Sequence, residues 1–322
     1  MTAGGAGQVA AGAGGAYAVI VSYQCREHLA YSVQSLLDTE QPDGLRVVVV
    51  DNGSTDGTAE YVATAFPSVT VLRLRRNRGF TGGANAGLRY ALRQDATLIG
   101  LFNADIRIHP AWLRAASAVL AADPRIGCVG FEQIGGLRSG AAPPDRWPII
   151  DRVAARPRTS VSGACLCIAP RALRHVGLFD RGFRTFSEET DLYLRLQRAG
   201  FSLLEVSVPS WHLNGGYWSR RPLLGTYRLM RSLLRYGIKH WPASQFWPRF
   251  ARLARLCCSA DRKLDLSYRF HLMLRDQPAA VRLLIFAAAA AANVAGLPRT
   301  LLARRRCSAV PRWEPEHLAV SR

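Results

Sequence analysis

Short apolar runs alternate with amphipathic stretches along the first hundred residues. Runs rich in valine and isoleucine predict strands, and the stretches between them have apolar residues at helical spacing. The predicted strands are residues 16–22, 46–51, 69–74 and 96–102, and the predicted helices are residues 27–37, 58–65 and 82–93. This order is typical of β-α-β units, so we expect an α/β fold with a Rossmann-like, mostly parallel sheet and flanking helices.

The pattern continues and then changes towards the C-terminus. We expect strands at residues 126–131, 161–169 and 201–208, and helices at 171–176 and 188–198. From residue 223 to 238 apolar residues follow helical spacing while Arg228, Arg231 and Arg235 line another side, which predicts a cationic amphipathic helix. The apolar stretch at 283–298 is shorter than the roughly 20 residues of a bilayer crossing, so we expect a packed or membrane-surface helix.

These changes divide the chain into three parts. Residues 1–16 are a Gly/Ala-rich segment that lacks the basic start and apolar centre of a signal peptide, and we expect a flexible tail. Residues 17–216 form the expected α/β domain, and residues 217–322 form a basic helical region. The seven cysteines show no C-x-x-C pair and fit a reducing cytoplasm.

The positive charge of this 322-residue chain is concentrated in its last third. Residues 1–216 carry 22 basic and 18 acidic side chains, a net charge of +4, whereas residues 217–322 carry 20 and 5, a net charge of +15. The asymmetry suggests a near-neutral part joined to a cationic region that meets an anion, such as phospholipid, nucleic acid or a phosphorylated acceptor.

Polar residues stand at the carboxyl ends of the predicted strands, where open α/β sheets bind ligands. Ser22 and Tyr23 follow the first strand, and Asp51 ends the second. Asp51 can accept a hydrogen bond from a nucleobase or ribose, or cap the next helix, and we favour the ligand. For Asp56, which precedes Gly57-Thr58, we favour the helix cap.

A glycine-rich segment follows the third strand. Gly79, Gly82 and Gly83 would let backbone amides approach a phosphate at the start of the helix, although a tight turn explains them equally well. Asp105 follows the fourth strand, where a carboxylate suits Mg²⁺ or Mn²⁺ bridging two phosphates. The alternative for Asp105 is a helix cap before His109-Pro110.

Three carboxylates begin the helix predicted at 188–198. Glu188, Glu189 and Asp191 could simply be stabilised by the helix dipole, or one could be a general base that removes a proton from an attacking hydroxyl. His212 is either a buried histidine with satisfied hydrogen bonds or a metal ligand, and spacing alone favours the first.

In this order the motifs resemble the family 2 glycosyltransferases of the GT-A fold, especially the bacterial rhamnosyltransferase-like branch. The resemblance runs from about residue 17 to 216 and rests on VVDNGSTDGT (49–58), NRGFTGGANAG (77–87), the triplet NAD (103–105) and GLFDRGF…SEETDLYLRLQRAGF (177–201). It implies that residues 17–216 are a GT-A catalytic domain that transfers a sugar from a nucleoside diphosphate to an acceptor hydroxyl with inversion.

The resemblance also implies roles for individual residues. Asp105 matches the last member of the Asp-x-Asp signature that holds the metal on the diphosphate, with His212 as a further ligand. Glu189 matches the catalytic base, with Glu188 and Asp191 as neighbours that position it or the acceptor. The residues expected to bind the nucleotide sugar are Ser22, Tyr23, Asp51, Gly79, Gly83, Asn85 and Asn103.

Two positions depart from the family pattern. The first Asp of Asp-x-Asp is Asn103, which contributes no charge and could lower metal affinity, and the base position holds Glu189 instead of the commoner Asp. The longer side chain reaches about one methylene further and need not harm proton transfer.

We expect a cytoplasmic enzyme that uses Mg²⁺ or Mn²⁺ and a dTDP- or UDP-linked donor, for example of rhamnose or another hexose. Its acceptor could be lipid-linked, with the basic region resting on the inner face of the membrane, and its product could be an envelope polysaccharide, a glycolipid or a glycosylated metabolite. The alternatives are a protein that binds nucleic acid through the basic region and a sugar nucleotidyltransferase. We do not expect nucleic acid as a partner, because that would leave the acidic residues at the strand ends unexplained.

Overall fold

The structure, a computed structural model, describes residues 14–40, 43–135, 144, 146–213, 221–258 and 277–313. Its strands are β1 (Ala16–Ser22), β2 (Leu45–Asp51), β3 (Thr70–Arg73), β4 (Leu98–Asn103), β5 (Ile106–Ile108), β6 (Ile126–Gly135), β7 (Ala155–Arg158), β8 (Cys165–Ile168) and β9 (Ser202–His212). Its helices are α1 (Arg26–Leu37), α2 (Thr58–Ala65), α3 (Gly79–Arg93), α4 (Trp112–Ala122), α5 (Pro170–Val176), α6 (Glu188–Arg198), α8 (Pro222–His240), α9 (Ala243–Cys258), α11 (Ala279–Ala295) and α12 (Leu297–Ser308).

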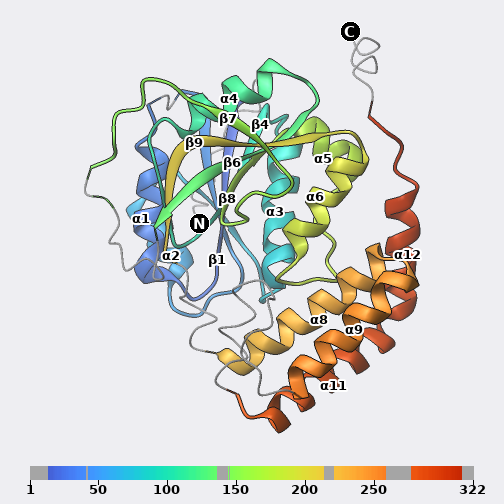
Figure 1. Cartoon of the computed structure of the whole chain (residues 1–322). Coiled ribbons are helices and arrows are strands. Elements are labelled where there is room, and N and C mark those ends of the chain that lie inside the picture. The colour runs from blue at the N-terminus through green and yellow to red at the C-terminus, as the bar shows by residue number, and fades with distance from the viewer. Residues whose placement is uncertain are drawn as a thin grey trace, which may run out of the picture.

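The strands of the described residues form one sheet in the order β3-β2-β1-β4-β8-β6-β9-β5, and β7 pairs with β9 (Figure 1). β3, β2, β1 and β4 are parallel, as the β-α-β pattern predicted. Beyond β4 the sheet is mixed, because β8 runs antiparallel to both β4 and β6 while β9 runs parallel to β6. The predicted α/β fold is therefore confirmed, and its parallel half is the half whose strand ends carry the candidate nucleotide residues.

Most predicted elements are present within a few residues of their expected bounds, but α3 begins earlier than expected. Its first residue is Gly79, where the backbone N–H donates to Asn77 Oδ1 at 2.7 Å. The glycines that we expected in a loop before the helix lie in its first turns instead. The sequence pattern also missed β5, α4 and β7, and β5 proves important because it pairs with the end of β9.

The helices of the basic region pack together beside the α/β part (Figure 1). Leu229 and Met230 from α8, Leu253 from α9, and Phe286 and Ala289 from α11 form a second apolar cluster. The helix predicted at residues 223–238 is confirmed as α8. In the part of the chain that the structure describes, no single helix is long and apolar enough to span a membrane, although the bent pair α11 and α12, at 67°, passes that test of length and composition together.

Some expectations fall on residues that the structure does not describe. Residues 1–13 of the expected tail, the boundary expected at 216/217, and residues 259–276 and 314–322 of the basic region lie outside the described residues.

Candidate active site

The pairing of β5 with β9 brings two predicted metal ligands together. Ile106 lies opposite His212 in this antiparallel pair, so Asp105, directly before Ile106, lies beside the imidazole. His212 Nε2 is 3.0 Å from Asp105 Oδ1 and 3.3 Å from Asn103 Nδ2. The backbone N–H of Leu213 donates to Asp105 O at 3.0 Å, which fixes the end of β9 against this turn.

These side chains fit a divalent cation. A carboxylate oxygen and an imidazole nitrogen within hydrogen-bond distance of each other can both turn to one ion, and oxygen and imidazole donors suit Mn²⁺ or Mg²⁺. His212 is 6% exposed, and its Nδ1 has no hydrogen-bond partner among the described residues. The part of the chain that the structure describes contains no group of three or more His, Cys, Asp or Glu side chains arranged as a metal site.

Asp105 also affects a neighbouring thiol at the start of α1. Burial raises the pKa of Cys25 to about 12, and the negative charge of Asp105 contributes to the rise. Cys25 Sγ lies 3.8 Å from the carbonyl oxygen of Ala104. The N-terminal end of α1 is therefore packed against the Asn103-Ala104-Asp105 turn, and the thiol stays protonated at neutral pH.

The three carboxylates at the start of α6 have different environments. Glu188 is buried, Glu189 is half-buried, and Asp191 is fully buried. Asp191 Oδ2 accepts a hydrogen bond from Arg195 Nε at 2.9 Å, and its Oδ1 binds Lys239 Nζ and lies 2.7 Å from His240 Nε2. Asp191 therefore joins α6 to the end of α8, and of the three carboxylates Glu189 keeps the most access.

The segment directly before β8 connects Glu189 with Asn103. A Cβ atom built on Gly163 would be 3.1 Å from Glu189 Cγ, so the glutamate packs directly on this residue. The next residue, Ala164, accepts a hydrogen bond from the backbone N–H of Asn103 at 2.8 Å. Glu189 is thus linked through residues 163 and 164 to Asn103, which lies beside His212 and Asp105.

The ends of β1 and β2 offer two buried polar atoms beside each other. Ser22 and Asp51 are register partners in the parallel pair, and both are buried. Ser22 Oγ and Asp51 Oδ2 have no hydrogen-bond partner within the described part of the chain, whereas Asp51 Oδ1 accepts from the backbone N–H of Ser54 at 3.1 Å. Tyr23 follows directly and is half-buried. A hydroxyl and a carboxylate oxygen at adjacent strand tips can bind the hydroxyl and N–H groups of a nucleoside.

The other expected donor-binding residues lie on α3 and have structural contacts. A Cβ on Gly83 would be 2.7 Å from Val21 Cγ1, so this glycine lets α3 pack closely on β1. Asn85 Nδ2 donates to Phe179 O at 2.8 Å, and Asn85 Oδ1 accepts from Phe179 N at 3.0 Å. Asn85 therefore ties α3 to the segment before α6, and its buried amide is occupied in this structure.

Asn52 is a residue that the sequence analysis missed. Its side chain accepts from the backbone N–H of Arg78 and donates to Gly79 O, each at 3.0 Å. It thereby fixes the end of β2 to the start of α3, where Gly79 has a φ of 73°. The signal was present in the sequence, since Asn52 directly follows Asp51. The N-cap position of α2 is Gly57, and Asp56, one residue earlier, accepts a hydrogen bond on Oδ1 from the backbone N–H of Thr58 at 3.2 Å, so it contacts the helix start from outside the cap position where we expected it.

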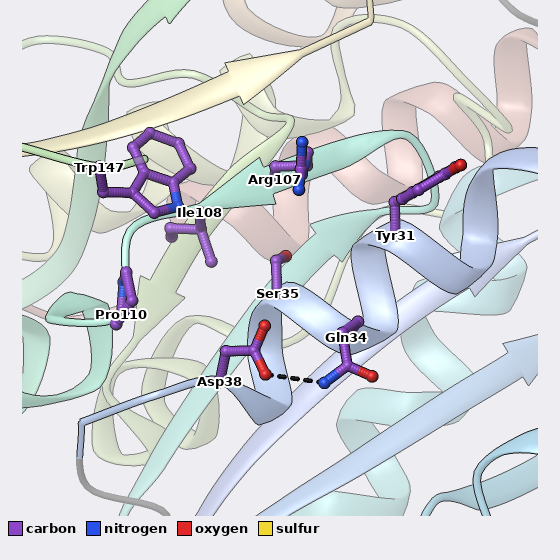
Figure 2. Close-up of a pocket in the computed structure, with 8 residues that line it drawn as sticks. All are labelled: Tyr31, Gln34, Ser35, Asp38, Arg107, Ile108, Pro110 and Trp147. Atoms are coloured by element: carbon purple, nitrogen blue, oxygen red, sulfur yellow. Dashed lines mark hydrogen bonds between the residues drawn. The ribbon is translucent and has the colours of Figure 1, made fainter. Parts of the chain in front are cut away.

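A small pocket lies between α1 and β5 (Figure 2). It is lined by Tyr31, Gln34, Ser35, Asp38, Arg107, Ile108, Pro110 and Trp147. Figure 2 shows Gln34 turned toward Asp38, to which it donates a hydrogen bond of 2.7 Å. The volume of about 100 Å³ holds only a few water molecules, and none of the predicted site residues lines it.

Comparisons with known proteins identify the family of this chain. The sequence model of "Glycosyl transferase family 2" matches residues 17–182. An N-acetylglucosaminyl-diphospho-decaprenol L-rhamnosyltransferase of Mycobacterium tuberculosis is 29% identical over 227 residues, which cover 60% of this chain and 73% of that protein. An uncharacterized glycosyltransferase of Bacillus subtilis, YfnE, is 38% identical over 76 residues, which cover 23% of this chain and 19% of the relative.

Solved structures show the same fold. GalNAc-T7 with UDP, GalNAc and Mn²⁺ superposes with a TM-score of 0.57 at 16% identity, covering 88% of this chain, which spans only 57% of that chain. The mannosyltransferase PcManGT of Pyrobaculum calidifontis, in complex with GDP-Man and Mn²⁺, gives a TM-score of 0.52 at 18% identity, covering 95% of this chain and 83% of the other. At such low identity the likeness shows the fold alone.

Proposed function

Because the chain belongs to glycosyl transferase family 2, we propose that it is a metal-dependent, inverting enzyme that moves a hexose such as rhamnose from a dTDP- or UDP-linked donor to a lipid-linked acceptor in cell-envelope synthesis. The observation that carries this proposal is the approach of Asp105 to His212 at 3.0 Å, with Glu189 packed on the neighbouring strand segment. The family match disfavours both alternatives, a nucleic-acid-binding protein and a sugar nucleotidyltransferase.

The donor binds across the ends of β1, β2 and β4. Ser22 and Asp51 bind the nucleoside through the two oxygen atoms that have no hydrogen-bond partner among the described residues. Asp105 and His212 would hold a divalent cation. When bound, the cation stabilises the negative charge on the departing diphosphate. Asn103 adds an amide beside the imidazole, at 3.3 Å, but no charge. Solved neighbours that contain Mn²⁺ and a nucleotide or nucleotide sugar support this donor class.

Glu189 is the general base. Its carboxylate removes the proton from the acceptor hydroxyl while that oxygen attacks the anomeric carbon from the face opposite the diphosphate. One bond forms as the other breaks, so the configuration inverts, and the proton remains on Glu189 until it passes to water. The partial exposure of Glu189, against the burial of Glu188 and Asp191, supports this choice.

Two variants test the roles of Glu189 and Asp105, with donor binding and turnover measured separately. Glu189→Gln should keep donor binding and lose transfer by a factor of about 10² to 10⁴, whereas Asp105→Ala should lose Mn²⁺-dependent donor binding. Thermal shift with uridine, thymidine and guanosine diphosphate sugars, with and without Mn²⁺, identifies the donor, and release of nucleoside diphosphate from that donor measures turnover. Wild-type turnover by Glu189→Gln would move the base to another carboxylate, and release of pyrophosphate would indicate a nucleotidyltransferase.

The acceptor reaches the enzyme at the inner surface of a membrane. The mycobacterial relative is named for a diphospho-decaprenol acceptor, and the helices of the basic region expose large apolar side chains beside their arginines, including Leu223, Trp247, Leu284 and Leu302. Exposed apolar and cationic side chains on one helical layer suit anionic lipid. Flotation with anionic vesicles at low salt tests this step, and Leu284→Glu should weaken binding; failure of the wild-type protein to float would contradict it.

A further inference from the structure

The segment 180–187, which leads into α6, has an unusual backbone. Arg184, Phe186 and Ser187 have φ values of 59°, 65° and 61°, in the left-handed region that residues other than glycine rarely adopt. Such conformations cost free energy and persist only where surrounding contacts hold them. Glu188 and Glu189 follow directly, so this segment determines where the proposed base lies.

One face of α8 supplies contacts that hold this segment. Arg231 Nη1 donates to Gly182 O at 3.0 Å, and Ser232 Oγ lies 3.2 Å from Phe183 O and 2.9 Å from Thr185 O. Residues 231, 232, 235 and 239 share a face at helical spacing, and Arg235 and Lys239 complete the set. Each of these four side chains therefore points to the segment before the base.

The last two are cations that pair with a half-buried acid, Asp180, and a buried one, Asp191. Arg235 Nη2 lies 2.9 Å and Lys239 Nζ 3.0 Å from Asp180 Oδ2, and Lys239 also binds Asp191 on α6. Burial alone would raise the pKa of Asp180, but the charges of Lys239 and Arg235 lower it below its ordinary value. Arg235 and Lys239 are only 5% and 4% exposed, so their charges are paired inside the protein and do not face solvent.

The opposite side of the segment rests on the start of α3. The backbone N–H of Thr81 donates to Arg184 O at 3.1 Å, and a Cβ on Gly79 would lie 2.7 Å from that oxygen. The segment is thus held between the start of α3 and α8.

We infer that the α8 face formed by Arg231, Ser232, Arg235 and Lys239 positions the general base by holding segment 180–187 in its left-handed conformation. This inference rests on the proposed role of Glu189. It makes the basic C-terminal region part of the catalytic apparatus, with these side chains acting through Glu189 without touching the substrate.

Arg231→Met and Ser232→Ala test the inference, because both remove hydrogen bonds to the segment while leaving the buried ion pairs of Asp180 intact. A base displaced by a fraction of an ångström should lower kcat about 10- to 100-fold, with the KM for the donor changed less than about twofold because the α3 side is untouched. Arg231→Lys, which keeps a donor near Gly182 O, should recover most of the loss.

Arg171→Met is the matched control. Arg171 is also a partly buried arginine that donates to loop carbonyls, those of Pro124 and Ile126 at 2.9 Å, but this loop lies outside the candidate site. We expect it to lower the melting temperature and keep kcat. If Arg231→Met and Ser232→Ala likewise lose only stability, α8 merely supports the fold and the inference is wrong.

A double variant separates this inference from the proposed function. If α8 acts through Glu189, Arg231→Met should cause little further loss of transfer in a Glu189→Gln background. Full additivity would overturn the inference. Wild-type transfer by Glu189→Gln alone would instead overturn the base assignment, which is a separate result.

Discussion

Replacement of Asp191 by asparagine should destabilise the fold, because this carboxylate is the centre of a buried charge cluster. It is fully buried and in contact with Arg195, Lys239 and His240. Without it, Arg195 has no other carboxylate partner among the described residues, while Lys239 keeps Asp180. Removing one member of a buried ion pair costs about 3–5 kcal/mol. Because Lys239 keeps its contact with Asp180, we expect the free energy of unfolding to fall by about 3 kcal/mol.

Thermal unfolding followed by circular dichroism at pH 7 measures this effect. For a chain of 322 residues, a loss of about 3 kcal/mol lowers the melting temperature by about 4–5 °C. Asp123→Asn is the control, since Asp123 pairs with Arg125 on the surface, where the arginine side chain is 65% exposed. An exposed pair contributes about 1 kcal/mol or less, so that variant should melt within about 1.5 °C of the wild type.

The pH dependence gives a second, independent check. Burial would raise the pKa of Asp191, but the contacts with His240, Arg195 and Lys239 lower it below its ordinary value. A carboxylate whose pKa is lower in the folded state stabilises the fold above its unfolded pKa of about 3.9, and this stabilisation is lost as the pH falls through the folded value. The difference between wild type and Asp191→Asn should therefore be largest near neutral pH and shrink below about pH 4. Equal melting temperatures at pH 7, or a difference that stays constant at pH 3, would refute the reasoning.

Three further predictions concern the candidate site. His212→Ala should weaken Mn²⁺-dependent donor binding at least about 10-fold, measured by calorimetry with the nucleoside diphosphate, and unchanged affinity would exclude His212 as a ligand. Gly79→Ala should destabilise the fold by about 1–2 kcal/mol or more, because φ is 73° and the added Cβ would lie 2.7 Å from Arg184 O; a wild-type melting temperature would contradict this. Asn85→Ala should lose about 1–3 kcal/mol of stability and keep its donor affinity in a binding assay, since both polar ends of the amide bind Phe179; lost affinity at full stability would restore a donor-binding role.

The parallel half of the sheet could be predicted because its inner strands β1, β2 and β4 are largely buried on both faces. Val47, Val48, Val49 and Val50 are at most 2% exposed, and such continuous apolar runs are visible in a single sequence. Asp51, at the end of this run, was therefore recognised as a strand-tip residue. β5 could not be found in this way, since three residues are too few for a periodic pattern, and its pairing with β9 depends on a partner more than a hundred residues away.

The contacts of the candidate site likewise depend on residues that are far apart in the sequence. The residue type and position of Asp105 suggested a metal ligand, and His212 was expected as a ligand only through the family resemblance, yet their 3.0 Å contact exists only because β5 and β9 pair. Asn85 shows the converse: its place in a glycine-rich motif suggested a ligand contact, whereas its partner, the main chain of Phe179, lies 94 residues further along. Local patterns indicate which side chains are available, and long-range pairing decides which of them can meet a ligand.

Part of the positive charge of the C-terminal region lies inside the molecule. The amphipathic pattern of residues 223–238 predicted a cationic side with Arg235 on it, but Arg235 is buried and pairs with Asp180. Lys239 is likewise internal, so part of the +15 excess neutralises acids of the α/β part and is unavailable to an anionic surface. Arg305 and Arg306 on α12 are exposed. The salt dependence of vesicle binding should therefore follow substitutions at those two arginines, while substitutions at Arg235 and Lys239 should alter stability and transfer.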